Sequence, residues 1–160
     1  MNRRAVIVFA ALGLAACAGR PTLPAARADR GPPPVAQRRA LFVHSALAML
    51  GRPYRYGGTG PAGFDCSGLV VYAAARAGIA VPRTTREQLH IGVAVSRDRL
   101  RAGDLVFMHF PHKQLHVGIA IDARRFVHAP AARGRVRIDS LASPVYGRAF
   151  LRARRIAFPH

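Results

Sequence analysis

The sequence predicts an α+β domain in which N-terminal helices pack against a C-terminal antiparallel β-sheet. Between residues 36 and 91, apolar side chains recur at helical spacing. After Gly92 they form short alternating or continuous runs that are separated by turn residues, as in a sheet of hairpins. Helices that precede strands along the chain favour layers that stay segregated. A chain of 160 residues has room for one such domain and an appendage.

The appendage is expected at the N-terminus. Residues 1–4 are a short basic segment, and the apolar run that follows, Ala5 to Ala16, carries no charge. A helix of that length spans only about 18 Å, which is too short for a bilayer core of about 30 Å. Residues 1–16 are therefore interpreted as a signal peptide, and the proline-rich residues 17–36 as an extended tether. The folded domain is predicted over residues 37–160.

The end of the signal peptide, Leu14-Ala15-Ala16-Cys17, resembles the bacterial lipobox. That resemblance implies that Cys17 is acylated and becomes the first residue of the mature chain, which would hold the protein in the cell envelope. Ala18 follows instead of an aspartate, so the outer membrane, facing the periplasm, is expected in a cell with two membranes. The alternative is an ordinary export signal that is cleaved near Ala16.

Three helices are predicted in the first half of the domain. The first, from Ala36 to Leu50, carries an apolar face and is stopped by Gly51. The second, from Cys66 to Ala77, is apolar enough to be buried, and a third, short helix is predicted over residues 85–91. Residues 54–65 contain four glycines and a proline, so they are predicted to form a loop.

The strands are predicted from short apolar runs in the second half of the chain. They cover residues 104–110, 115–122, 125–128 and 135–138, with a closing strand over residues 153–158. A hairpin that turns near residues 122–124 would bring His116 and His128 to the same end of the sheet.

The charge and the cysteine content of the chain bear on its possible partners and exclude some classes of protein. The chain has 25 basic and 7 acidic residues, which gives a formal net charge of +18. Such a surplus often indicates nucleic acid or another anionic partner. Here the arginines are scattered among abundant alanine, glycine and proline, so no nucleic-acid partner is expected. Two cysteines exclude a scaffold with several disulfides and a zinc site with four thiolates.

The candidate nucleophile is Cys66, which is predicted where the glycine-rich loop meets the second helix. Free backbone N–H groups and the helix dipole favour a thiolate there. A nucleophilic thiol also needs a base and a group that orients the base, and His116 and His128 are placed to supply them. On spacing alone, a buried structural cysteine remains the alternative.

Six motifs then occur in one order from about residue 37 to the C-terminus. They are Tyr54-Arg-Tyr-Gly-Gly58, Phe64-Asp-Cys-Ser-Gly-Leu-Val70, Val81-Pro-Arg-Thr-Thr85 with Gln88, Ala102-Gly-Asp-Leu-Val-Phe107, His116-Val-Gly-Ile-Ala-Ile121 and Phe126-Val-His-Ala129. This combination resembles the NlpC-type cell-wall cysteine peptidases, which have a papain-like fold.

The resemblance implies a role for each matching residue. Cys66 corresponds to the nucleophile, His116 to the general base and His128 to the third polar residue, which orients the imidazole. Asp65 and Ser67 correspond to positions that line the substrate cleft. Tyr54 corresponds to the aromatic residue beside the cysteine and is a candidate second oxyanion donor, after the Cys66 backbone N–H. Arg83 corresponds to a recurrent position with either a packing or a substrate-binding role.

The same resemblance implies a substrate, the stem peptides of peptidoglycan. The reaction would be hydrolysis through an acyl-enzyme, and no metal or cofactor is implied. Cleavage of a γ-D-glutamyl–diamino acid bond within a stem or of a D-alanyl–diamino acid crosslink between stems fits equally well.

Three alternatives remain open. His109, His112 and His116 have a spacing that could be mistaken for a zinc site, although residues around a turn need not converge. A non-catalytic module that binds an envelope polymer is a second alternative. An acyltransferase of papain-like fold, which would transfer the acyl group to an amine or a lipid, is the third.

Overall fold

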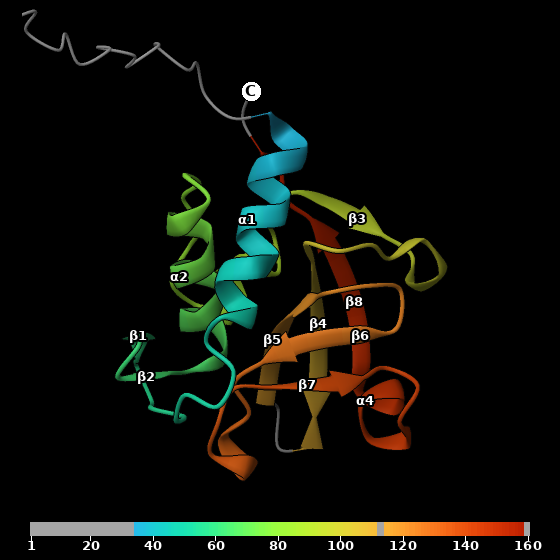
Figure 1. The fold of residues 1–160 in the computed structure, drawn as a ribbon. Helices are drawn as coiled ribbons and strands as arrows, with labels where there is room; N and C mark the ends of the chain where they lie inside the picture. The colour runs from blue at the N-terminus through green and yellow to red at the C-terminus, as the bar shows by residue number, and fades with distance from the viewer. Residues whose placement is uncertain (1–33, 112–113, 159–160) are drawn as a thin grey trace, which may run out of the picture. The chain divides into compact units, whose positions relative to one another are not determined.

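The protein is described by a computed structural model that covers residues 34–111 and 114–158. Its helices and its main sheet form two layers, with α1 (Val35–Leu47) and α2 (Cys66–Arg76) on one face of the sheet (Figure 1). Two shorter helices are α3 (Thr85–Gln88) and α4 (Pro144–Ala149), and two 3₁₀ turns cover Arg97–Arg99 and Ala131–Arg133. The predicted layer architecture, helices first and an antiparallel sheet second, is confirmed.

The main sheet has six strands in the order β3-β8-β4-β5-β6-β7, and every neighbouring pair is antiparallel. The strands are β3 (Val93–Val95), β4 (Asp104–Phe110), β5 (Gln114–Ala120), β6 (Arg125–His128), β7 (Arg137–Ser140) and β8 (Phe150–Arg155). A separate small hairpin, β1 (Thr59–Gly60) and β2 (Gly63–Phe64), precedes α2. The last strand of the chain thus lies inside the sheet, between β3 and β4.

Both faces of the sheet are covered by apolar side chains. One cluster fills the space between the helices and the sheet and includes Phe42, Leu69, Phe107 and Ile119. A second cluster on the opposite face includes Val106, Met108, Phe126 and Leu141, with Tyr146 of α4 packed against it. Because successive strand residues point to opposite faces, a strand buried on both faces needs a continuous apolar run. This explains the Leu-Val-Phe-Met sequence of β4.

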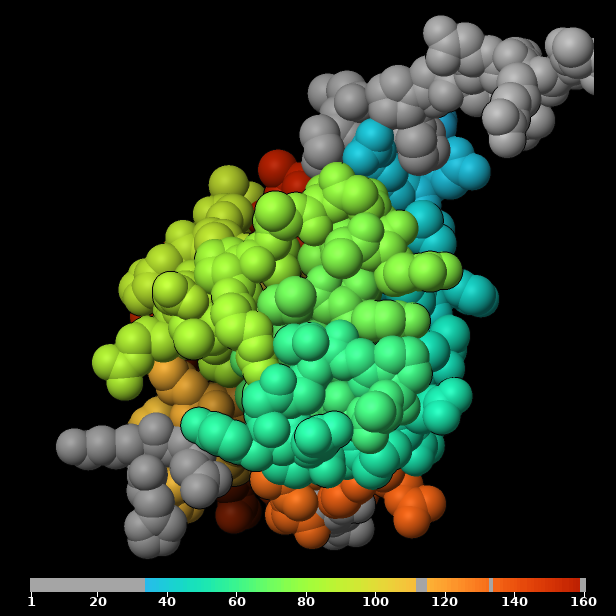
Figure 2. Space-filling model, turned by 90° about the vertical axis from the view of Figure 1, so that its left-hand side faces the viewer, coloured from blue at the N-terminus to red at the C-terminus, as the bar shows by residue number. Residues whose placement is uncertain are grey.

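The surface over the helical layer is built largely from the segments that flank α2. Seen from that side, the loop before α2 and the segment after it lie beside the helix and cover most of the sheet in this view (Figure 2). None of the helices in residues 34–111 and 114–158 is long and apolar enough to cross a bilayer. The predicted signal peptide, Cys17 and the tether to residue 33 lie outside the described residues.

Several element boundaries differ from the sequence predictions. The third helix ends at Gln88 instead of Ile91, the strand predicted over residues 135–138 is Arg137–Ser140, and the closing strand is Phe150–Arg155 instead of 153–158. Ile156 and Phe158, which suggested the later position, pack into the first cluster after the strand has ended. β3 and α4 were not predicted, because neither is long enough to show a period.

Candidate active site

Cys66 is the first residue of α2, as its position after the glycine-rich loop predicts. It is a free, partly buried cysteine. Its Sγ lies 3.4 Å from Oγ1 of Thr85, the first residue of α3, so the two helix starts meet at the thiol. Within the described residues no hydrogen bond is found for the Cys66 backbone N–H.

Asp65 caps α2 and organises the loop around the cysteine. Its Oδ1 accepts a hydrogen bond from the backbone N–H of Gly68 at 2.6 Å, and its Oδ2 accepts one from Gly57 at 2.9 Å. The guanidinium of Arg83 donates to both oxygens, at 3.1 and 2.6 Å, and to Ser67 Oγ at 2.9 Å. The structure therefore brings Asp65, Ser67 and Arg83, all predicted as substrate-binding residues, into one network.

These contacts also keep the Asp65 carboxylate charged. Burial alone would raise its pKa, but the hydrogen bonds from Arg83 and from the Gly68 N–H outweigh burial and hold the pKa below its usual value. Arg83 keeps 39% of its side chain exposed, so part of the guanidinium faces solvent beside the thiol.

Two glycines allow the loop to lie directly on the first turn of α2. A Cβ atom at Gly68 would come within 1.9 Å of the Gly58 carbonyl oxygen, and one at Gly58 within 2.3 Å of the Gly63 carbonyl oxygen. A side chain at Gly68 would push the loop away from the helix start, and one at Gly58 would clash within the loop itself. A hydrogen bond of 3.1 Å from the Asp65 N–H to the Gly58 carbonyl also stabilises this close approach.

Tyr54 lies close enough to Cys66 and Asp65 for their charges to act on its phenol. Burial raises the pKa of its phenol, and negative charge on Cys66 and then on Asp65 raises this pKa further. The backbone of Tyr54 bridges to Phe64 and bonds to Gly134, which ties the loop to the far end of the sheet. Tyr56, two residues further along the same motif, is 90% exposed.

The two predicted histidines form a direct pair. Nε2 of His116, on β5, lies 2.7 Å from Nδ1 of His128, on β6. The hairpin between their strands turns at residues 121–125, as predicted, with Ala120 paired with Phe126. Gly118, two residues after His116, makes room for this pair, because a Cβ atom there would come within 2.6 Å of the Phe126 ring and 3.3 Å of His128 Cβ.

A residue that the sequence analysis did not identify continues this chain of contacts. Nε2 of the fully buried His128 lies 2.8 Å from Oδ2 of Asp139, on β7. Arg137 donates to the same carboxylate through Nε at 2.6 Å and Nη2 at 2.5 Å. The available signal was weak: Asp139 directly follows the predicted strand 135–138 in a domain with few acidic residues.

Both histidines are neutral at neutral pH. Burial lowers the pKa of His116 to about 3, and a positive charge on His128 would lower it further. Burial also lowers the pKa of His128, to about 4, although Asp139 acts in the opposite direction. A neutral imidazole can accept a proton, which is the requirement for a general base.

Cys66 and His116 belong to elements that contact each other. Both α2 and α3 pack against β5, the strand of His116. The side chains of Cys66 and His116 are not hydrogen-bonded to each other, and Nδ1 is the His116 nitrogen that the bond to His128 leaves unused. The described residues thus hold a thiol at a helix start and, on a strand that this helix contacts, a neutral imidazole whose Nε2 is already held by His128.

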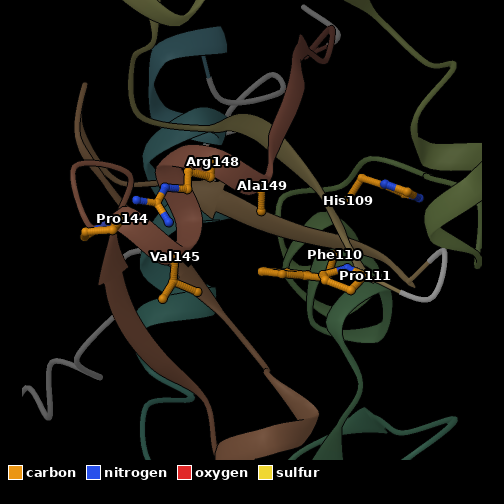
Figure 3. A pocket seen from close by; sticks show the side chains of 7 residues that line it. All are labelled: His109, Phe110, Pro111, Pro144, Val145, Arg148 and Ala149. Carbon is orange, nitrogen blue, oxygen red and sulfur yellow. The ribbon is translucent and has the colours of Figure 1, made fainter.

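An open pocket of about 310 Å³ lies beside the histidine pair, between the end of β4 and α4 (Figure 3). It is lined by His109, Phe110, Pro111, Pro144, Val145, Arg148 and Ala149. Phe110 links this pocket to the site, since its ring centroid is 6.1 Å from that of His116 and 6.0 Å from that of Tyr146.

The histidines considered as a zinc pattern do not share a face of the sheet. His116 pairs with Met108, so His109, the next residue of β4, points to the opposite face. His112 lies outside the described residues. In the part of the chain that the structure describes, no three His, Cys, Asp or Glu residues are placed to hold a metal ion.

A cysteine at the start of a helix that packs on an antiparallel sheet carrying a histidine pair defines the papain-like α+β class. Residues 51–155 match the model of the NlpC/P60 family, and the chain belongs to this family. The family and the fold predicted from the motifs are thus confirmed.

Relatives with known names are similar over most of the domain. The probable endopeptidase NlpC of Escherichia coli is 36% identical over 163 residues, which cover 96% of this chain and 99% of the relative. The probable endopeptidase YafL of the same organism is 41% identical over 122 residues, which cover 72% of this chain and 49% of the relative. The chain spans only about half the length of YafL and of a second relative, the murein DD-endopeptidase MepH.

Solved structures of NlpC/P60 proteins have a similar fold. A crystal structure of an NlpC/P60 family protein from Bacillus cereus superposes with a TM-score of 0.69 at 33% identity, covering 76% of this chain and 40% of that one. The peptidoglycan hydrolase RipB of Mycobacterium tuberculosis superposes with a TM-score of 0.67 at 26% identity, covering 79% of this chain and 67% of that one.

Proposed function

We propose that this protein is a cysteine endopeptidase that hydrolyses the stem peptides of peptidoglycan during remodelling or recycling of the cell wall. The observations that carry the proposal are a thiol at the start of α2 and, on the strand against which α2 packs, a neutral His116 that is held by His128. The names of the relatives support it, since they are called endopeptidases and peptidoglycan hydrolases.

The first half of the reaction forms an acyl-enzyme. His116 takes the proton from the Cys66 thiol while a sulfur lone pair attacks the carbonyl carbon of the scissile bond, and the π electrons move to the carbonyl oxygen. The C–N bond then breaks, and the leaving amine takes the proton from His116. A thioester on Cys66 remains.

The second half consumes one water molecule. His116 takes a proton from the water as its oxygen attacks the thioester carbon. The C–S bond breaks, the sulfur regains the proton from His116, and the peptide leaves with a new carboxyl group. No metal or cofactor takes part in the proposed steps.

The groups around the thiol have supporting roles in this scheme. The Cys66 backbone N–H, which no described residue engages, is the first oxyanion donor, and the Tyr54 hydroxyl is the candidate second. Asp65 holds the helix start and the loop together. The exposed part of the Arg83 guanidinium, with Ser67 behind it, is available to bind a carbonyl or carboxylate of the substrate.

The bond that we expect to be cleaved is the D-alanyl–diamino acid crosslink. The names of two relatives, the murein DD-endopeptidases MepH and MepS, favour it over the γ-D-glutamyl bond within a stem. This choice is separate from the proposed chemistry, which serves either bond.

Digestion of defined muropeptides, analysed by mass, tests the proposal. A crosslinked dimer should yield two monomers that together have gained one water, and Cys66→Ala should yield none. His109→Ala, which changes an exposed histidine on the other face of β4, is the matched control and should keep wild-type turnover. A product that gains an acyl group would instead indicate an acyltransferase, and binding of muropeptides without any product would indicate a binding module.

We also propose that the mature chain begins at an acylated Cys17 and is anchored in the cell envelope, at the periplasmic face of the outer membrane in a cell with two membranes. The lipobox-like sequence before Cys17 supports this. Cys17→Ser should abolish acylation and release the protein from membrane fractions. Unchanged membrane association of that variant would contradict the anchor.

A further inference from the structure

Asp139 lies at the end of a chain of side-chain contacts that starts at the proposed general base. His116 bonds to His128, His128 bonds to Asp139, and the guanidinium of Arg137 closes the chain. The carboxylate is the only member of this chain that accepts hydrogen bonds without being able to donate any while it is ionised. The ionised carboxylate therefore determines which nitrogen of each imidazole ring carries the proton.

The carboxylate is held in the ionised form. Burial would raise its pKa, but hydrogen bonds from Arg137, His128 and Tyr146 outweigh burial and keep the pKa below its usual value. Arg137 cannot lose its proton in a protein, so Asp139 always faces a permanent cation. Only 18% of the Asp139 side chain is exposed, which limits competition from water.

The positions of the ring protons follow from this charge. Because the Asp139 carboxylate only accepts, Nε2 of His128 must carry the proton that it shares with Oδ2. A neutral imidazole has a single N–H, so His128 Nδ1 is an acceptor. The 2.7 Å contact with His116 then requires a proton on His116 Nε2, and His116 Nδ1 is left with a free lone pair.

We infer that Asp139 is a positioning residue that acts through His128: it selects the tautomer of both rings and so keeps His116 Nδ1 unprotonated, ready to accept the Cys66 proton. The inference rests on the proposed function for its kinetic consequence, and on contacts alone for the tautomers. When His116 gains its second proton, the same chain offers Nε2–H an uncharged acceptor backed by a carboxylate, which stabilises the imidazolium.

Without the carboxylate, the opposite arrangement becomes available. His128 can place its proton on Nδ1 and donate to His116 Nε2, which moves the His116 proton to Nδ1. That tautomer of His116 has no lone pair for the thiol proton. We therefore expect Asp139→Asn and Asp139→Ala to lower kcat on a muropeptide by about 10- to 100-fold with little change in KM.

The matched control is another aspartate–arginine pair, at the other end of β4 from Met108, which pairs with His116. Asp104 accepts from Arg155 through both oxygens, at 2.8 and 2.7 Å, and is completely buried. Asp104→Asn should destabilise the protein while leaving kcat per folded molecule unchanged. Asp122→Asn, at the exposed hairpin turn, removes a further such pair and controls for misfolding of the Asp104 variant.

The deciding measurement is the tautomer of each ring, read from ¹⁵N–¹H correlation spectra of the histidine-labelled protein at pH 7. In the wild type, His116 and His128 should both be protonated on Nε2 and bare on Nδ1, which requires no variant to fold and no activity. In Asp139→Asn or Asp139→Ala, part or all of the His116 population should shift to Nδ1–H, together with the fall in kcat.

Three results would overturn the inference: Nδ1–H on His116 in the wild type, wild-type kcat in both Asp139 variants, or a lower kcat with unchanged tautomers. The last would mean that Asp139 only supports the fold. If the wild type cleaves no muropeptide at all, the proposed function fails, and the spectra still decide whether Asp139 sets the tautomers.

Discussion

The two halves of the candidate site each rest on an aspartate that is paired with an arginine, and the two aspartates do different work. Asp65 accepts from two backbone N–H groups and from Arg83, so it holds together a loop and a helix start. Asp139 accepts from Arg137 and from an imidazole that itself contacts a second imidazole. The same kind of ion pair therefore holds backbone groups in place at the Cys66 half of the site and sets the positions of the ring protons at the histidine half.

This difference shows that a short ion pair does not by itself indicate a role in stability or in chemistry. What matters is which group shares the carboxylate. A backbone N–H has one protonation state, so Asp65 can only hold it in place. An imidazole has two neutral tautomers, so Asp139 can choose between them.

The largest effect on activity is expected when the proposed general base, His116, is removed. His116→Ala should reduce kcat/KM on a muropeptide about as severely as Cys66→Ala, by roughly 10⁴-fold or more, because the two residues act as a unit. Steady-state rates of both variants and of the double variant check this. A double variant much slower than either single variant would contradict it, since residues that act together are not additive.

Removing the structural aspartate should appear in stability. Asp65→Ala is expected to lower the free energy of unfolding by about 1–3 kcal/mol, because α2 loses its N-cap and the Gly57 N–H and Arg83 lose their acceptor. Urea denaturation measures the loss. Asp122→Asn, at an exposed ion pair, should cost less than about 0.5 kcal/mol. Equal costs for the two variants would contradict the assigned role of Asp65.

The third residue of the site should matter less than the base. His128→Ala is expected to lower kcat by about 10- to 100-fold, and His128→Gln by less, because a glutamine can still hydrogen-bond to His116 while alanine leaves the ring free to rotate. Rates on one muropeptide for the two variants decide the order. Wild-type activity in His128→Ala would mean that the third member is misassigned.

A change of pH also separates the two halves, through their different effects on stability. Because burial lowers the pKa of His116 and His128, the unfolded chain binds protons below about pH 6.5 that the folded protein does not. Stability should therefore fall from pH 6.5 towards pH 4, by up to about 1.4 kcal/mol per pH unit for each ring. The pKa values of Asp65 and Asp139 are lowered in the folded protein. The stability that these two carboxylates contribute is therefore lost only at lower pH, near and below the ordinary pKa of an aspartate.

Urea denaturation at pH 7, 6 and 5 tests this, with His109→Gln as the control at an exposed histidine. The His128→Gln variant should show a shallower loss of stability on acidification. A stability that stays constant between pH 7 and pH 5 in the wild type would contradict neutral, buried rings.

The features that could be predicted from the sequence are those with local causes. The start of α2 at Cys66 follows from a run of glycines that ends where apolar spacing begins, and the histidine pair follows from one hairpin with a short turn. β3 and α4 could not be predicted, because three and six residues show no period. Among the described residues β3 pairs only with β8, which follows it by more than 50 residues, and α4 lies against β4.

The same reasoning explains which site residues were missed. Thr85 closes the motif Val81-Pro-Arg-Thr-Thr85, but a motif does not show that α2 and α3 meet at the thiol. Asp139 reaches His128 because β7 pairs with β6 in a register that sets Arg137 opposite His128 and Asp139 opposite Phe126. A shift of one residue would turn the carboxylate to the other face of the sheet, and only the fold determines that register.

The place of β8 inside the sheet bears on how the protein is made. The strands from β4 to β7 are neighbours in sequence, so the hairpin that carries both histidines needs no distant partner. β4 and β3, in contrast, remain unpaired along one edge until residues 150–155 have left the ribosome, and such open edges invite pairing with other chains. We expect chains truncated before Phe150 to aggregate, as light scattering of a refolding chain would show. Within the described residues, the continuous sheet therefore depends on β8, the strand that is synthesised after all the others.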